Sequence, residues 1–349
     1  MEEIEIRLLR TDDIQQINDL YFKSYKVKRS NEKFSWEFLN CPAGPAIYVV
    51  AVDTKMNKVV GTQCAIPLFV SDSSRARILT AKSEDTLVDA DYRGKNIFER
   101  MYALLFEECR KAGIVSLWGF TYAVKPFKKI GFDIPFSCDF GLIALNGRGA
   151  YRYFDGLKPK RSFVEKLKIA GMSVVSRMKY ILHSKSSLKG YSVSTEVQQS
   201  LESVVPSNGF HLVLDSNFFN WRLRTNPYPN NHLYYALSDS SGKLAGSVIC
   251  SQSAEVSYIM NMAFDHDLSR RTKESFLDHV INDISTKTSV LRFWGFTHNN
   301  IGRDEIELLK SSGFIFTGQG ISFVWKKLDE ISPLDVNNFV LSRMASQGT

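Results

Sequence analysis

The sequence predicts an α/β fold, layered in the α+β manner, that contains two tandem copies of one domain, each a mixed sheet flanked by helices. Three observations predict it. The chain has 349 residues, a length that suits about two domains. Short apolar segments of strand character alternate with segments of helical periodicity. Features of the first half return in the same order in the second half, at nearly equal spacing.

The repeat is marked by aromatic and glycine positions. Two tryptophans, Trp36 and Trp221, mark the repeat: each lies six residues before a proline and 25 residues before a glycine. The matching positions are Trp36 and Trp221, Gly61 and Gly246, Trp118-Gly119-Phe120-Thr121 and Trp294-Gly295-Phe296-Thr297, and Gly131-Phe132 and Gly313-Phe314. A period this long indicates a duplicated domain rather than a solenoid of short repeats.

The first half is predicted to begin with a strand and then a helix, because Thr11-Asp12-Asp13 supplies helix-capping side chains after an alternating segment. Strands are predicted at 4–9, 46–52, 59–69, 78–88, 115–120 and 137–145. Helices are predicted at about 11–25, 98–111 and 126–130. The central strands are expected to include a parallel pair.

The second half is predicted to repeat this order. Strands are expected at 191–195, 233–237, 244–251, 256–264, 290–296 and 315–325, with helices near 196–204 and 271–284. The predicted organisation is therefore a domain at 1–146, a linker at 147–190, a second domain at 191–330 and a tail at 331–349.

Composition restricts the class of protein. A hydrophobic content of 44% excludes global disorder, and no apolar run reaches the length of a membrane-spanning helix. The start Met-Glu-Glu-Ile-Glu is acidic and lacks the apolar core of a signal peptide, so we expect a cytoplasmic protein. The five cysteines have no paired spacing and are expected to be free thiols. No histidine pair has metal-ligand spacing, so no metal is expected.

The linker holds the positive charge of the chain. Between residues 147 and 190, eleven Lys or Arg residues face two acids, a net charge of +9, whereas the whole chain carries +7. Within it, apolar residues recur at helical spacing over 161–182. Three interpretations stay open: a helix packed on a domain, a helix lying on an anionic membrane, and an RNA-binding stripe. Nucleic acid is the partner we expect least.

A basic loop follows the predicted strand 78–88. It reads Arg93-Gly94-Lys95-Asn96 and precedes a helix that opens at Ile97. Backbone N–H groups at a helix N-terminus form an anion site. The loop resembles the pyrophosphate-binding loop of the GNAT superfamily of acyl-CoA N-acyltransferases, whose pattern is [Gln/Arg]-x-x-Gly-x-[Gly/Ala]. Arg93 fits the first position, Asn96 stands at the glycine, and Phe98 stands at the small residue. Asn is expected there because it tolerates a left-handed backbone.

The resemblance, to tandem-domain bacterial members of this superfamily, implies acetyl-CoA as co-substrate. The strand end would present backbone groups to pantetheine, and the loop amides would hold the pyrophosphate. The implied cofactor-binding residues are Leu87, Val88, Asp89, Arg93, Gly94, Lys95, Asn96, Ile97 and Phe98.

Catalysis would require a base for the acceptor ammonium. Strand alternation puts Glu84 on one face with Thr86 and Val88, and Asp85 on the other. Relatives carry a carboxylate on the face of Val88, which favours Glu84 as the base and leaves Asp85 as a substrate contact. Relatives often carry a tyrosine where this chain has Phe127, so Tyr122 is the candidate acid for the leaving thiolate.

The corresponding turn of the second half, 265–271, lacks glycine and carries Asp265 and Asp267, acids that would repel a pyrophosphate. That half is predicted to be degenerate. The expected function is N-acetyltransfer from acetyl-CoA to a small-molecule amine, with an amino sugar of surface-polysaccharide synthesis as one acceptor. The alternatives are a Fem-like transferase that uses aminoacyl-tRNA and a non-catalytic binding protein of the same fold. The sequence does not predict the oligomeric state.

Overall fold

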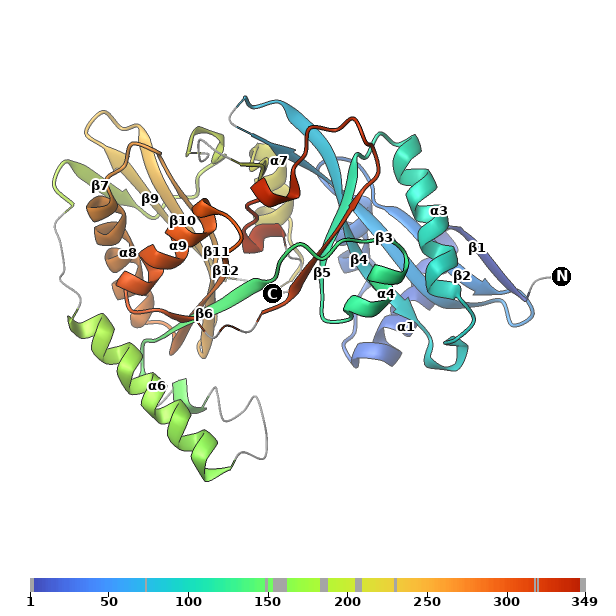
Figure 1. The fold of residues 1–349 in the computed structure, drawn as a ribbon, viewed down its shortest axis with the longest axis horizontal. Helices are drawn as coiled ribbons and strands as arrows, with labels where there is room; N and C mark the ends of the chain where they lie inside the picture. The colour runs from blue at the N-terminus through green and yellow to red at the C-terminus, as the bar shows by residue number, and fades with distance from the viewer. Residues whose placement is uncertain are drawn as a thin grey trace. The chain divides into compact units, whose positions relative to one another are not determined.

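The structure is a computed structural model in which two compact units alternate along the chain (Figure 1). Unit 1 consists of Met1–Phe136, Asn217–Tyr228 and Ser322–Val336, and unit 2 of Ser137–Ser216, Pro229–Ile321 and Asn337–Thr349. The described residues are 3–72, 74–147, 150–152, 162–182, 188–204, 209–228, 231–316, 318 and 320–345. Among the helices described, none has the length and hydropathy that crossing a membrane would require.

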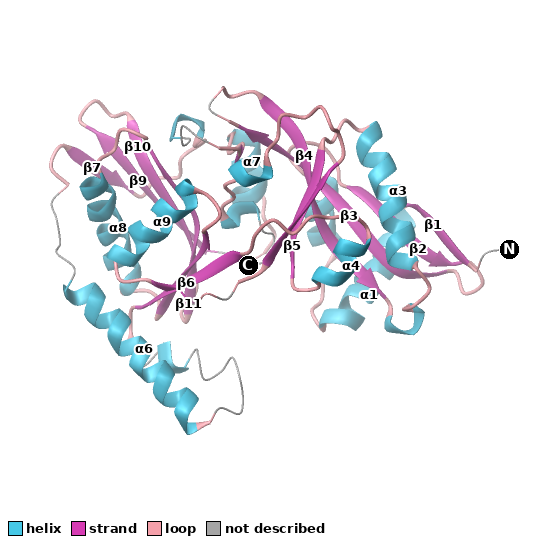
Figure 2. Cartoon of the chain, in the orientation of Figure 1, coloured by secondary structure: helices cyan, strands magenta, loops and turns pink. Residues whose placement is uncertain are grey.

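Unit 1 is built on a mixed sheet whose strands run in the order β1-β2-β3-β4-β5-β14 (Figure 2). The strands are β1 Ile4–Leu8, β2 Ile47–Asp53, β3 Lys58–Ser71, β4 Arg77–Val88, β5 Ser116–Thr121 and β14 Ser322–Lys327. The helices are α1 Ile14–Tyr25, α2 Asn31–Phe34, α3 Ile97–Lys111, α4 Val124–Lys129 and α7 Ser216–Phe219. Apolar side chains of α3, among them Met101 and Leu105, pack on Val49, Ala51 and Leu117 of the sheet.

Unit 2 is built on a seven-stranded sheet with the order β13-β6-β12-β11-β10-β9-β7. The strands are β6 Cys138–Ala144, β7 Tyr191–Ser194, β9 Asn231–Asp239, β10 Leu244–Gln252, β11 Val256–Phe264, β12 Val290–Phe296 and β13 Ile315–Phe316. A short strand, β8 at His211–Leu212, lies outside this sheet. The helices are α6 Phe163–Leu182, α8 Arg270–Ser285 and α9 Asn300–Ser311. Phe276 and Val280 of α8 and Leu309 of α9 lie in its core.

The two halves exchange their last strands, which changes the domain limits expected from the sequence. β6 comes from the first half but pairs with β12, from Ala144 opposite Val290 to Cys138 opposite Phe296. β14 comes from the second half but pairs with β5. The expected boundary at 146 therefore lies beyond a strand of unit 2, and residues 322–336 belong to unit 1.

Two predicted elements of the second half were wrong. The strand expected at 315–325 is divided into β13 and β14, which lie in different sheets. The helix expected near 196–204 is reduced to a 3-10 turn at Glu202–Val204. Two serines explain the turn, because the Ser194 and Ser200 hydroxyls accept hydrogen bonds from the amides of Glu196 and Glu202, and such local bonds compete with the helix.

Candidate active site

The candidate site of unit 1 begins where β4 and β5 separate. Their parallel pairing joins Ala81 to Leu117 and Lys82 to Trp118, and among the described strands no pair continues it. β4 stays paired with β3 as far as Val88. Beyond Lys82, the edge of β4 that faces β5 is consequently available for other hydrogen bonds.

A β-bulge interrupts β4 just after this separation. Glu84 lies opposite Cys64, but Leu87 lies opposite Thr62, so Asp85 and Thr86 share one partner position. Asp85 has a left-handed backbone with φ of 51°. The non-glycine residue in this conformation marks a locally strained strand.

The bulge overturns the strand alternation expected from the sequence. The Thr86 hydroxyl donates to Gln63 and lies 3.5 Å from the Tyr102 hydroxyl on α3. Glu84, in contrast, forms an ion pair with Lys82. The charges of Glu84 and Asp85 both raise the pKa of Glu37.

Asp85 is held by a buried network. Arg29 Nη2 donates to Asp85 Oδ2 at 2.9 Å, and the Tyr48 hydroxyl donates to the same oxygen. The Arg29 guanidinium also lies 4.3 Å from the centre of the Tyr21 ring. Burial opposes the charge of Arg29, but Asp85 outweighs this effect and raises the pKa of Arg29 above its ordinary value. Asp85 is therefore an anchor for Arg29 and Tyr48.

Glu37 is a candidate functional residue that the sequence analysis missed. It lies in a π-helical turn, Ser35–Leu39, and its side chain is 12% exposed. Burial, and then the charge of Asp85, raises the pKa of Glu37 to about 8. The Tyr228 hydroxyl donates to Glu37 Oε2 at 3.4 Å. The available signal was an acid within an aromatic segment, Phe34 to Phe38, which is a composition typical of buried chain.

Of the three predicted catalytic residues, only two are connected to Glu37. Asp85 is paired with Arg29, whose guanidinium also lies 3.9 Å from Glu37, and Glu84 affects Glu37 by its charge. Tyr122, which follows β5, is 74% exposed. Within the described chain, Tyr122 makes no hydrogen bond to these residues.

The strand end before the basic loop is fixed by Asp89. Its amide donates to the Val60 carbonyl at 2.8 Å. Its fully buried carboxylate forms ion pairs with Lys23 at 2.6 Å and Lys58 at 3.1 Å. Of the other expected pantetheine contacts, Leu87 and Val88 are paired with β3. Their backbone edges toward β5 remain outside the β4–β5 ladder.

The basic loop has the backbone that its glycine and asparagine predict. Gly94 and Asn96 have left-handed conformations, with φ of 82° and 55°. Ile97 begins α3, and within the described chain no side chain caps its first turn. Arg93 and Lys95 are exposed and have no ion-pair partner among the described residues, although Lys95 Nζ lies 4.9 Å from the centre of the Tyr92 ring.

The two aromatic departures from the GNAT pattern contact each other. The rings of Phe98 and Phe127 are 5.6 Å apart, and both pack on Tyr102, at 4.8 and 5.7 Å. This packing explains how a large side chain, Phe98, is accommodated beside the first turn of α3, where the GNAT pattern has a small residue. The Tyr102 hydroxyl lies 2.7 Å from the Ser83 hydroxyl. Burial raises the pKa of Tyr102.

The two marker tryptophans of the repeat meet within unit 1. Their rings stack at 5.2 Å, and each indole N–H donates to the carbonyl of the other residue at 2.8 Å. Trp36 and Trp221 occupy equivalent π-helical turns, Ser35–Leu39 and Asn220–Arg224. The contact therefore fixes the turn that carries Glu37.

Comparisons with known proteins agree with this geometry. Solved structures with the same fold include a probable N-acyltransferase from Enterococcus faecalis (12% identity, TM-score 0.60, 94% of this chain and 73% of that one). A GCN5-related N-acetyltransferase from Anabaena variabilis has 12% identity and a TM-score of 0.58, over 93% and 73% of the chains. Saccharomyces cerevisiae N-myristoyltransferase with bound myristoyl-CoA has 12% identity and a TM-score of 0.58, over 94% and 79%.

At these identities the structures show the fold alone. No curated protein matches the chain significantly by sequence. A family model for the GNAT acetyltransferase domain matches residues 5–134, the part that contains β1 to α4, the bulge and the basic loop. Residues 5–134 thus match the GNAT acetyltransferase domain family.

Proposed function

We propose that the protein transfers an acetyl group from acetyl-CoA to the primary amine of a small molecule, with an amino sugar of surface-polysaccharide synthesis as acceptor. The observation that carries the proposal is the N-terminus of α3, next to the separation of β4 from β5. No described side chain caps this terminus, and Arg93 and Lys95 beside it have no ion-pair partner among the described residues. The acetyl group follows the description of the matching domain family. The acceptor class rests on the resemblance to tandem bacterial members alone.

Acyl-CoA fits the residues present. The amides at the start of α3 would hold the pyrophosphate, with Arg93 and Lys95 as counter-charges. The left-handed Gly94 and Asn96 shape this turn. The free edge of β4 would receive the pantetheine amides, and the thioester would then lie near the bulge at Asp85.

We infer that Glu37 accepts the proton of the acceptor amine. A base works best when its pKa lies near the working pH, and the pKa of Glu37 is raised to about 8. Glu84, the sequence-based candidate, is ion-paired with Lys82. The amine nitrogen would attack the thioester carbonyl, the C–S bond would break, the amine proton would pass to Glu37, and the thiolate would leave and take a proton from solvent.

Two matched variants test this assignment. Glu37→Gln and Glu84→Gln each keep the shape of the side chain and remove its basicity. We expect Glu37→Gln to lower turnover by about 10²–10⁴ while acetyl-CoA affinity, measured by calorimetry, is unchanged. The rise of the wild-type rate toward pH 8 should disappear in this variant.

The other outcomes are equally informative. A loss of turnover in Glu84→Gln, with a normal Glu37→Gln enzyme, would return the role to Glu84. Turnover of aminoacyl-tRNA without CoA binding would support the Fem-like alternative. Binding of acyl-CoA without transfer to any of a panel of amines and amino sugars would support the non-catalytic alternative.

A further inference from the structure

Helix α6 of unit 2 presents an apolar surface to solvent. Among the described residues, it holds eight of the sixteen exposed large hydrophobic side chains, with exposed fractions from 49% to 78%. Phe163 and Leu182, near its two ends, are the most exposed of the eight. The alternative of a helix whose apolar face packs on a domain is therefore not what the structure shows.

The exposed residues form one stripe along the helix. At 3.6 residues per turn, they fall within an arc of about 120°. Within this arc, five of them lie along the length of the helix: Phe163, Leu167, Val174, Met178 and Ile181. The helix has 20 residues and is about 30 Å long, so the stripe extends over about the same distance.

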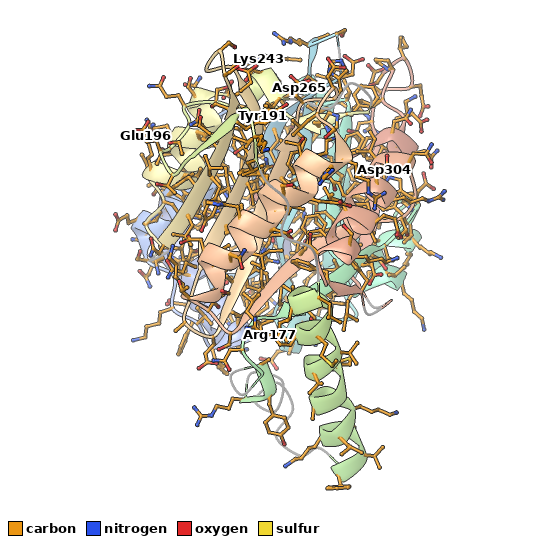
Figure 3. All side chains as sticks on the ribbon, turned by 90° about the vertical axis from the view of Figure 1, so that its left-hand side faces the viewer. Arg177, Tyr191, Glu196, Lys243, Asp265 and Asp304 are labelled. Atoms are coloured by element: carbon orange, nitrogen blue, oxygen red, sulfur yellow. The ribbon has the colours of Figure 1, made fainter. Side chains whose placement is uncertain are left out.

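The helix is attached to unit 2 by a different face. The Ala144 amide donates to Ser176 Oγ at 3.1 Å, and Ser176 Oγ lies 3.2 Å from the Gly313 carbonyl, to which it donates. Ser176 is fully buried and lies outside the arc of the stripe. Figure 3 shows the helix extending beyond the labelled Arg177, away from the sheet of unit 2.

The charged residues of α6 indicate what kind of partner the apolar stripe binds. The sequence of α6 carries Lys166, Lys168, Arg177 and Lys179 against Glu165, within a segment of net charge +9. At 3.6 residues per turn, the four basic positions lie outside the apolar arc, on either side of it. A second copy of the chain would bring a second positive segment against the first. An anionic bilayer offers an apolar layer below a negative surface, which suits an apolar stripe with basic flanks.

We propose that α6 lies in the surface of an anionic membrane, with its apolar stripe among the acyl chains and its basic residues at the headgroups. The helix would bind parallel to the surface, because its opposite face is attached to unit 2. This consequence rests on the proposed function: acyl transfer would then take place at a membrane surface.

The test is sedimentation of the full chain with vesicles of phosphatidylglycerol and phosphatidylcholine, compared with phosphatidylcholine alone. We expect binding to the anionic vesicles only, and weaker binding as salt screens the attraction. The double variant Leu167→Gln, Val174→Gln should bind at least about tenfold less. The matched control, Met56→Gln with Ile331→Gln, changes two apolar residues elsewhere that are at least as exposed, and it should bind like the wild type.

A second readout reports the depth of the helix. A Val174→Trp variant should show a blue-shifted emission with anionic vesicles relative to the same protein without vesicles, and Met56→Trp should show no vesicle-dependent shift. Absence of binding at low salt would overturn the proposal. So would a stripe variant that binds normally, a dimer that the stripe variant dissociates without any vesicle binding, or RNA binding that the stripe variant abolishes.

Discussion

The two halves end their long central strand in the same way and then diverge. The Asp89 amide donates to Val60 and the Asp265 amide to Ala245, both at 2.8 Å. Asp89 forms an ion pair with Lys58, and Asp265 forms one with Lys243. Asp265 is therefore the repeat counterpart of Asp89 and a structural acid. Because an equivalent acid precedes the basic loop of the first half, Asp265 by itself does not distinguish the two halves.

The difference between the halves lies after this acid. In the first half, α3 starts at an asparagine whose side chain does not cap the helix. In the second half, the Ser269 hydroxyl accepts a hydrogen bond from the Thr272 amide and caps α8. The first half thus leaves the helix N-terminus open to an anion, and the second half satisfies part of it internally.

The basic residues near the two helix N-termini also differ between the halves. The second half has a pocket of about 420 Å³ near the start of α8, lined in part by Arg270 and Lys273. Arg270 Nε, however, lies 3.0 Å from Glu274. Asp304 and Glu305 also line this pocket. Arg93 and Lys95 of the first half have no such acidic partners among the described residues, so we expect CoA to bind the first half alone.

The largest expected effect comes from reversing the charge of this loop. Arg93→Glu should lower acetyl-CoA affinity by more than about 100-fold, because it places a carboxylate against the pyrophosphate and removes a cation. The matched change in the second half, Arg270→Glu, should leave affinity unchanged. Calorimetry should also give one CoA per chain. A stoichiometry of two, or equal losses in both variants, would mean that the halves do not differ in cofactor binding.

Much of unit 1 could be predicted from the sequence because its strands and helices follow local periodicity. The left-handed Asn96 is a local property and was predicted correctly. The bulge at Asp85 is not local, because it depends on the pairing of β4 with Cys64 and Thr62. The exchange of β6 and β14 has the same cause, since strand patterns predict a strand and not the sheet that accepts it. Glu37 could not be assigned because its pKa depends on residues distant in sequence.

A smaller effect should distinguish the two structural acids. Burial opposes ionisation of Asp89, but the hydrogen bonds from Lys23 and Lys58 outweigh it and lower the pKa of Asp89; that of Asp265 is lowered chiefly by Lys243. Asp89→Asn should cost about 1.5–3 kcal/mol in the free energy of unfolding, since it loses hydrogen bonds to a fully buried carboxylate. Asp265→Asn, which loses one partly solvated pair, should cost about 0.2–1 kcal/mol.

The sign of the pH dependence follows from the lowered pKa values. Both carboxylates have folded-state pKa values below the ordinary 3.8, so their stabilisation is present above pH 4 and is lost as the pH falls through the folded-state value. The difference between each variant and the wild type in urea unfolding should therefore be full at neutral pH and shrink in acid. If the two variants lose the same free energy of unfolding, the deeper burial of Asp89 does not make it more important for stability than Asp265.

The smallest effect concerns how each helix begins. Asn96 adopts φ of 55°, a conformation that costs ordinary L-residues about 1–2 kcal/mol and costs Asn less. Asn96→Ala should therefore destabilise the protein by about 1 kcal/mol, whereas Asn96→Gly should change its stability little and keep acetyl-CoA binding. Ser269→Ala removes the cap of α8 and should also cost about 1 kcal/mol. Urea unfolding measures these costs, and calorimetry separates them from binding. We expect Ser269→Ala to lower stability without altering the affinity for acetyl-CoA, because α8 does not hold the cofactor in the proposed site. If the affinity changes in Ser269→Ala and not in Asn96→Ala, the anion site belongs to the second half.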